Sequence, residues 1–390
     1  MSRTDALRPR RRRGPRINRF RVVSLVLITA VLAGMAFVGV STISGLRGEL
    51  ASLRSELREL PRDEAGELVS TPRLDPASSI VEYADGGAEA VIDMKTGKRV
   101  EITPVDRGKF AIVGSSSMAL MASSWASFAD RRGATFYDIS TGGWLAEHML
   151  ARYGSRPLIA DGFTIPASGA VPFTSPNVPY ISAQDFTMTG HFEGHEGLTG
   201  TVTRAPDGAS SWQFTRAASG EQTSVAAGAR FIPDVSDEVR DAVTVLNIGK
   251  NNLAGTSTPV EDLVKWTVEA YDYATATGKY VLVMGHFVNT DTPADSAIRD
   301  RVNAYNAAME EYFGARFVDV GSYVASESIW DATGISPTDR DREQQALGNK
   351  PPSLSATQGD SVDRLHLNTA GTRALEKLVE DRILVELNWY

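Results

Sequence analysis

Cysteine is absent from this chain of 390 residues. Disulfides, cysteine-ligated metal centres and thiol redox sites are therefore excluded, although exported proteins can also lack cysteine, so the compartment stays open. Positive charge is concentrated at the start: nine Arg and one Asp give residues 1–21 a net charge of +8, while the whole chain carries −8. The remaining residues therefore carry −16, which suits a polyanion poorly, and we expect no nucleic-acid partner.

Charged side chains are also missing from residues 22–43, an apolar run long enough to cross a bilayer as one helix. The basic tail precedes it, so the positive-inside rule predicts a single-pass protein of the cell membrane with a cytoplasmic N-terminus and an extracytoplasmic body. A cleaved signal peptide is the rival interpretation, with Gly34-Met35-Ala36 as a small-x-small site. The run continues to Val40, beyond the usual signal core, which favours an uncleaved anchor.

Residues 44–77 are predicted to form a stalk and a linker. Leucines recur there at alternating spacings of four and three, as in the seam of a coiled coil, and Pro61 begins a polar, turn-rich stretch. The seam covers about two heptads, which is short for a stable coiled coil but allows a weak homodimer. The leucines are Leu46, Leu50, Leu53, Leu57 and Leu60.

The body alternates predicted strands with predicted helices. Strands are expected at 110–113, 135–139, 242–248, 280–284 and 317–320, and helices at 118–129, 144–153, 258–278, 292–312 and 369–387. This alternation predicts an α/β fold with a parallel sheet covered on both faces, built from residues 78–154 and 236–390. Residues 155–235 lack a helical period and are rich in Gly, Thr, Ser and Pro, so we expect an inserted β-rich subdomain. Residues 331–362 are expected to be irregular and to cover the site.

Asp363-Arg364-Leu365-His366 stands where the closing helix is expected to begin. One helical turn would bring the carboxylate and the imidazole to one side. An Asp that orients a His forms two thirds of a nucleophilic triad, and the third member would be a Ser on a sharp turn after a strand. Gly114-Ser115-Ser116-Ser117 offers one, although Ser/Gly runs are also ordinary turn sequences.

Two further turns follow strands at the same end of the sheet. Asn251 lies in a turn after the third strand, where its amide could donate to an oxyanion, and Gly142 lies after the second strand, where a backbone N–H could do the same. Each segment alone is equally consistent with a capping Asn or a tight turn.

Together these four segments resemble the SGNH (GDSL-type) hydrolase family. Gly114-Ser115-Ser116 resembles its first block, 138–142 its second, Gly249-Lys250-Asn251-Asn252 its third, and 363–368 its fifth. The resemblance implies a three-layer α/β/α sandwich, with Ser116 as nucleophile and His366 and Asp363 as its triad partners. It further implies that Gly142 and Asn251 complete the oxyanion hole, and that no metal or organic cofactor is needed.

Two positions depart from the family pattern, because Ser115 and Asn252 each stand where the family has Asp. Neither supplies a reacting group, so the departures question the support of the turns more than the mechanism. Ser115 and Ser117 remain alternative nucleophiles if the register shifts by one. The α/β-hydrolase elbow is excluded, because no Gly-x-Ser-x-Gly sequence occurs.

Other histidines give weaker signals. His191 and His195 have the spacing of helical metal ligands, but neighbouring glycines argue against a helix, so an exposed loop is expected and no metal site is predicted. His286 follows the fourth strand, where a packed histidine is favoured over a substrate contact, and His148 is expected within a helix.

These observations predict a membrane-anchored serine esterase that cleaves small acyl esters, with acylated carbohydrates or lipids of the cell envelope as substrates. An acyltransferase using the same triad and a non-catalytic binding protein on a hydrolase scaffold are the alternatives.

Overall fold

The computed structural model describes residues 79–84, 87–93, 99–101, 105–180, 186–205, 211–255, 257–274, 279–358 and 361–390. The predicted basic tail (1–21), membrane span (22–43) and stalk (44–77) lie outside this part of the chain. Within it, no helix combines the length and the apolar character that a bilayer crossing requires. A small antiparallel sheet comes first, formed by β1 (Ser79–Ala84), β2 (Gly87–Asp93) and β3 (Arg99–Glu101).

Five parallel strands form the main sheet, in the order β14-β13-β12-β4-β5. Every residue of β12 and β13 is buried, as expected for strands that are covered on both faces. The predicted α/β class and parallel sheet are therefore confirmed. The strands are β4 (Asp106–Gly114), β5 (Thr135–Ser140), β12 (Ala242–Leu246), β13 (Val281–Met284) and β14 (Phe317–Val318).

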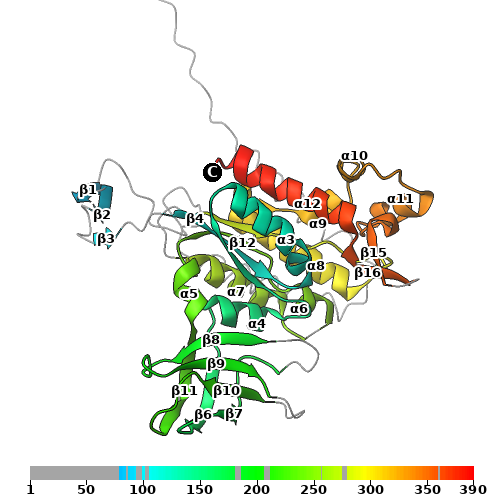
Figure 1. Ribbon diagram of the computed structural model, residues 1–390. Coiled ribbons are helices and arrows are strands. Elements are labelled where there is room, and N and C mark those ends of the chain that lie inside the picture. The colour runs from blue at the N-terminus through cyan, green and yellow to red at the C-terminus, as the bar shows by residue number, and fades with distance from the viewer. Residues whose placement is uncertain are drawn as a thin grey trace, which may run out of the picture. The chain divides into compact units, whose positions relative to one another are not determined.

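Helices lie on both sides of this sheet (Figure 1). Alternate strand residues, such as Phe110 and Ile112, share a core with α3 (Ser116–Arg131) and α12 (Thr369–Asp381), where Trp125 is fully buried. On the other side, α4 contacts α5, α7 and β4. The remaining helices are α4 (Ala146–Tyr153), α5 (Asp234–Val239), α6 (Lys250–Gly255), α7 (Val260–Tyr273), α8 (Ala297–Phe313), α9 (Val320–Val324), α10 (Ser328–Thr333) and α11 (Asp339–Ala346).

A separate six-stranded antiparallel sheet lies, in sequence, between α4 and α5, with the strand order β6-β11-β8-β9-β10-β7. It has its own aromatic core, in which the rings of Phe163 and Phe173 stack 4.8 Å apart and Phe192 meets Phe231 edge-on. Residues 155–235, predicted to be β-rich, contain this sheet. The bounds of these residues as a separate domain stay a prediction. The strands are β6 (Ile159–Ile165), β7 (Ala170–Phe173), β8 (Thr187–Phe192), β9 (Thr199–Arg204), β10 (Trp212–Arg216) and β11 (Thr223–Pro233).

The stretch predicted to be irregular, 331–362, is instead largely ordered into short elements. It contains α11, a 3-10 turn (Pro352–Leu354), and the strand β15 (Ser355–Gln358), which pairs with β16 (Ser361–Leu367). Asp341 in α11 is fully buried and accepts hydrogen bonds from Ser353 N (2.8 Å) and Oγ (2.7 Å), which ties the helix to the turn before β15. The closing helix ends at Asp381, earlier than predicted, and a π-helical turn (Arg382–Glu386) follows.

Candidate active site

The candidate site lies at the carboxyl end of the main sheet. β4 comes first along the chain, and β5 and β12 then pair on opposite sides of it. Their connections diverge there, and open α/β sheets bind ligands at such switch points. Thr141 N donates to Gly114 O (3.3 Å) and Asn247 N donates to Val113 O (2.9 Å), which holds the three strand ends together. Ser116 follows the end of β4 and is the first residue of α3.

Hydrogen bonds connect Ser116, His366 and Asp363 in a chain. The Oγ of Ser116 lies 2.8 Å from Nε2 of His366, and Nδ1 of His366 lies 2.7 Å from Oδ2 of Asp363. With the proton on Nδ1 donated to the carboxylate, Nε2 carries the lone pair that accepts the hydroxyl proton. The His366 side chain is 23% exposed and that of Asp363 only 7%, so solvent reaches the ring more readily than the acid. Such a chain can convert a serine hydroxyl into a nucleophile.

The Asp363 carboxylate is held in its charged form. Burial alone would raise its pKa, but hydrogen bonds from the His366 ring and from the backbone N–H groups of Leu365 and His366 lower the pKa below its ordinary value. Those two N–H groups donate to Oδ1 at 2.8 and 3.2 Å. The acid therefore both orients the ring and folds the backbone that carries the ring.

The prediction that one helical turn brings Asp363 and His366 together is wrong. Both residues belong to β16, and α12 begins only at Thr369. A regular strand would place residues three apart on opposite faces, roughly 10 Å from one another. The pairing shifts here, because Ala356 pairs with Asp363 whereas Ser355 pairs with Leu367. The intervening residues bulge out of the ladder, and this bulge brings the acid to the ring.

Lys350 supports this bulge, and the sequence analysis missed it. Its Nζ donates to the carbonyl oxygens of Asp363 (3.1 Å) and His366 (2.6 Å) and to Ser355 Oγ (2.8 Å), and the residue is fully buried. Burial lowers its pKa to about 8, although Asp363 acts in the opposite direction. A lysine in a loop gives no sequence signal for this role, because two of its three partners are backbone carbonyl oxygens of β16.

The two predicted oxyanion-hole residues lie on neighbouring loops. Gly142 lies in the turn after β5, and Asn251 lies in α6 after β12, where its Nδ2 donates to Trp144 O (2.8 Å). This bond joins the two loops and leaves the second N–H of the amide for another acceptor. As the first residue of α3, Ser116 also has a backbone N–H that no carbonyl of its own helix can accept. Helix N-termini favour negative charge.

The two departures from the family pattern have different structural outcomes. Asn252 is fully buried: its Oδ1 accepts from Ala146 N (2.8 Å) and its Nδ2 donates to Glu147 Oε2 (2.9 Å), so it fixes the start of α4. Ser115 is also fully buried, but its Oγ has no hydrogen-bond partner among the described residues. The Asn252 side chain thus supports the neighbouring turn, whereas the Ser115 side chain makes no such contribution among the described residues.

His286 is a packed residue, as the sequence favoured. It is 2% exposed, its Nε2 donates to Ile248 O (2.8 Å), and its Nδ1 accepts from Asn247 Nδ2 (3.3 Å). Burial, with a smaller contribution from the nearby Lys250, lowers its pKa to about 3. A neutral ring with both nitrogens bonded stabilises the loops after β12 and β13.

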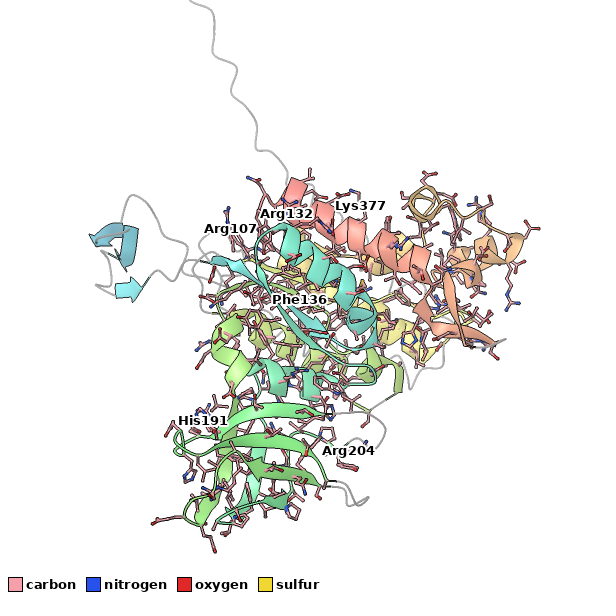
Figure 2. All side chains as sticks on the ribbon, viewed as in Figure 1. Arg107, Arg132, Phe136, His191, Arg204 and Lys377 are labelled. Carbon is pink, nitrogen blue, oxygen red and sulfur yellow. The ribbon has the colours of Figure 1, made fainter. Side chains whose placement is uncertain are left out.

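The other histidines contribute no metal site. His148 is buried in α4, its ring nitrogen lies 2.7 Å from Pro179 O, and burial lowers its pKa to about 4. Figure 2 shows His191 on the antiparallel sheet; it belongs to β8, so the expected loop is wrong there, and His195 lies in the turn that follows. In the described part of the chain, no three His, Cys, Asp or Glu residues are grouped so that they could hold a metal ion.

Comparison with known proteins gave distant structural similarities. No family model matches the chain, and no curated protein matches it. A solved structure from Bacteroides fragilis, assigned as an acylhydrolase, is 13% identical and gives a TM-score of 0.37, covering 74% of this chain and 92% of that one. A peptidoglycan O-acetylesterase structure is 13% identical with a TM-score of 0.28, covering 72% and 92%. With TM-scores below 0.5, neither similarity adds support for a fold family or an activity.

Proposed function

We propose that this chain is a serine esterase of the SGNH type, with a three-layer α/β/α body, that removes small acyl groups. The observation that carries the proposal is the hydrogen-bonded chain from Ser116 Oγ through His366 to Asp363 at the switch point of the sheet. Ser116 lies 250 positions before His366 in the sequence, and the order of serine, histidine and acid is that of a nucleophilic triad. Asn251 and Gly142 lie on two loops that are joined by the hydrogen bond from Asn251 Nδ2 to Trp144 O, and we assign them as the oxyanion donors.

The reaction proceeds through an acyl-enzyme. Nε2 of His366 takes the Ser116 proton as Oγ bonds to the ester carbonyl, and the carbonyl π electrons move to the oxyanion. N–H groups of Ser116, Gly142 and Asn251 stabilise that oxyanion, and losing one such donor typically costs about 3 kcal/mol in the barrier. The tetrahedral intermediate collapses, and the leaving alcohol takes the proton from His366. Water then adds with His366 as base, releasing the acid and restoring the hydroxyl of Ser116.

The substrate follows from the predicted topology rather than from the site. A body tethered outside the membrane by residues 22–43 would meet envelope glycans and lipids, so we expect acyl esters on such carriers. Transfer of the acyl group to a sugar hydroxyl would use the same acyl-enzyme, with an alcohol replacing water.

The proposal is tested by assaying the purified full-length chain in detergent. It should hydrolyse p-nitrophenyl acetate in the presence of EDTA, faster than the octanoate ester if small acyl groups are preferred. Adding a sugar acceptor separates hydrolysis from transfer, because only a transferase forms the acylated sugar. No turnover of any ester would contradict the proposal and favour the alternative of a binding protein on a hydrolase scaffold.

Lys350 is a positioning residue in this proposal. Lys350→Met should lower kcat by about 10- to 100-fold with little change in KM, because two carbonyls of the bulge lose their buried donor. The wild type should lose kcat above pH 8, where the ammonium deprotonates and two N–H groups remain for three acceptors. The variant should lack this alkaline decline.

The pH dependence of the free energy of unfolding distinguishes the alkaline loss of kcat from a loss of folded protein. The pKa of Lys350 is lower in the folded chain than its ordinary value, so between about pH 8 and 10 the unfolded chain binds more protons at this lysine. The Lys350 contribution to the free energy of unfolding therefore rises with pH while activity falls.

Lys279→Met is the matched control, because this buried lysine donates to the carbonyls of Tyr271 and Asp272 at the end of α7. If Lys279→Met abolishes the alkaline decline as well, the positioning role is wrong.

A further inference from the structure

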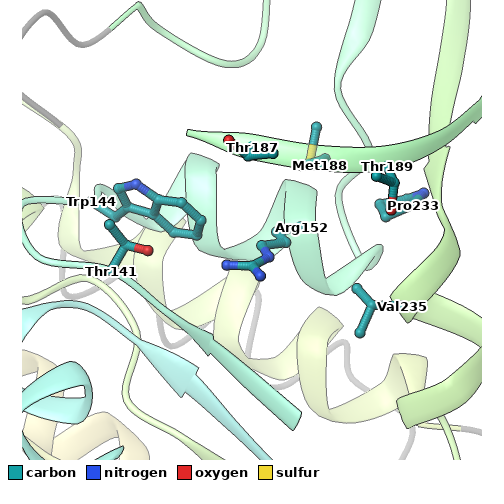
Figure 3. A pocket seen from close by; sticks show the side chains of 8 residues that line it. All are labelled: Thr141, Trp144, Arg152, Thr187, Met188, Thr189, Pro233 and Val235. Atoms are coloured by element: carbon teal, nitrogen blue, oxygen red, sulfur yellow. The ribbon is translucent and has the colours of Figure 1, made fainter. Parts of the chain in front are cut away.

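A cavity of about 360 Å³ lies where the turn after β5 meets the antiparallel sheet (Figure 3). One wall comes from Thr141 and Trp144 in that turn and from Arg152 in the last turn of α4. The opposite wall comes from β8 and from the junction of β11 with α5. These lining residues are Thr187, Met188, Thr189, Pro233 and Val235.

Arg152 is the charged side chain of this cavity, and it has no hydrogen bond or ion pair to any described residue. Its guanidinium lies 5.7 Å from the ring centre of Trp144, and Figure 3 shows it extending along the cavity toward that residue. Burial lowers its pKa, although the more distant Asp138 carboxylate acts in the opposite direction. The Asp138 carboxylate already accepts a hydrogen bond from the backbone N–H of Ser140 (2.9 Å).

The contrast with Arg156 shows what is unusual here. Arg156 follows the same helix, forms an ion pair with Glu269 (2.8 Å), and also lies over a Trp ring. A partly buried guanidinium without a carboxylate is costly, because its lost hydration is not repaid. An anion that entered the cavity would supply the missing partner, and a guanidinium binds a carboxylate or a phosphate through two parallel hydrogen bonds.

The cavity adjoins the candidate active site. Thr141, which lines it, donates its backbone N–H to Gly114 at the end of β4, two residues before Ser116. The turn that contains Gly142 therefore contacts the end of β4 and also lines the cavity. A substrate whose ester lies at Ser116 could place a neighbouring unit beside Arg152.

We infer that this cavity is a subsite for an anionic group, a carboxylate or a phosphate, on the carrier of the acyl ester. The inference rests on the proposed esterase function and specifies its substrate class as acylated acidic glycans. Thr187 and Thr189 line the opposite wall, and their hydroxyls are polar groups that the rest of the sugar could contact. The structure thereby gives the antiparallel sheet a role in substrate selection.

Calorimetry with the full-length protein tests the subsite without any turnover. Methyl glucuronide and glycerol phosphate serve as carboxylate and phosphate probes, and methyl glucoside as the neutral probe. At least one anionic probe should bind, and the tighter of the two identifies the group. Arg152→Gln should weaken that binding at least about tenfold, Arg152→Lys should restore part of it, and Arg156→Gln should leave it unchanged.

Kinetics then connect the subsite to catalysis. Arg152→Gln should raise KM for an O-acetylated glucuronide about tenfold, while kcat/KM for the small neutral ester p-nitrophenyl acetate stays the same. Equal binding of neutral and anionic probes, or anion binding that Arg152→Gln does not alter, would overturn the subsite. A chain that binds anions through Arg152 but hydrolyses no ester would instead overturn the esterase proposal and leave the subsite standing.

Discussion

Ser116→Ala is expected to lower kcat/KM for p-nitrophenyl acetate by about 10⁴-fold or more, because the variant has no hydroxyl for His366 to activate. The chain should remain folded, since Ser116 is half-buried at the start of α3 and Oγ is bonded to the His366 ring rather than to the core. Initial rates of nitrophenol release measure the loss, and thermal unfolding checks the fold.

Ser117→Ala and Ser115→Ala are the matched controls for this result. Ser117 is half-buried in the same helical turn, so its removal should leave kcat within a fewfold of the wild type. Ser115 Oγ is buried without a partner, so its removal should be tolerated or slightly stabilising. Loss of activity in Ser117→Ala or Ser115→Ala, with Ser116→Ala active, would assign the nucleophile to a different serine.

Asp363→Asn should have the second largest effect, a fall in kcat of about 10⁴-fold. The Asn oxygen can still accept the backbone N–H groups of Leu365 and His366, so the bulge should keep its shape. The amide nitrogen would then face Nδ1 of His366 and donate to it, which places the ring proton on Nε2. That tautomer cannot accept the proton of Ser116.

Thermal unfolding distinguishes a change of the His366 tautomer from a loss of structure. Asp363→Asn should unfold at nearly the wild-type temperature, whereas Asp363→Ala should be less stable because two backbone N–H groups lose their acceptor. If Asp363→Asn retains more than about a tenth of the wild-type kcat, the acid does not set the tautomer, and the assigned role of Asp363 is wrong.

The sequence predicted the main sheet well because its signals are local. Apolar runs such as those of β12 and β13 are buried on both faces and therefore lack alternation, and the helices α6 and α8 follow them along the chain. Ser116 and Asn251 lie in the first turn of a helix that follows a strand. Turn composition identifies such positions without knowledge of the fold.

The geometry of the acid and the base could not be predicted in this way. A spacing of three residues fits a helical turn, but the pairing of β16 with β15 places these residues in a strand, and only the bulge brings them together. That bulge depends on Lys350, whose partners are carbonyl oxygens of residues 13 and 16 positions away. Backbone acceptors have no residue identity, so no motif encodes such contacts.

The subsite around Arg152 could not be predicted for a related reason. Its walls come from the turn after β5, the end of α4 and β8, and the last lies in a different sheet. An arginine in the last turn of a helix is ordinary, because it complements the helix dipole. Only the structure shows that this guanidinium lacks an acidic partner among the described residues.

The central claim is that Ser116 forms the covalent acyl intermediate. It is tested most directly by treating the full-length protein with a fluorophosphonate, whose P–F bond is replaced by a bond to the attacking serine oxygen, and locating the adduct by peptide mass spectrometry. One adduct per chain on Ser116, which is absent after denaturation and in His366→Ala, is the predicted result. An adduct on a different serine, or none in a protein that still hydrolyses p-nitrophenyl acetate, would contradict the account.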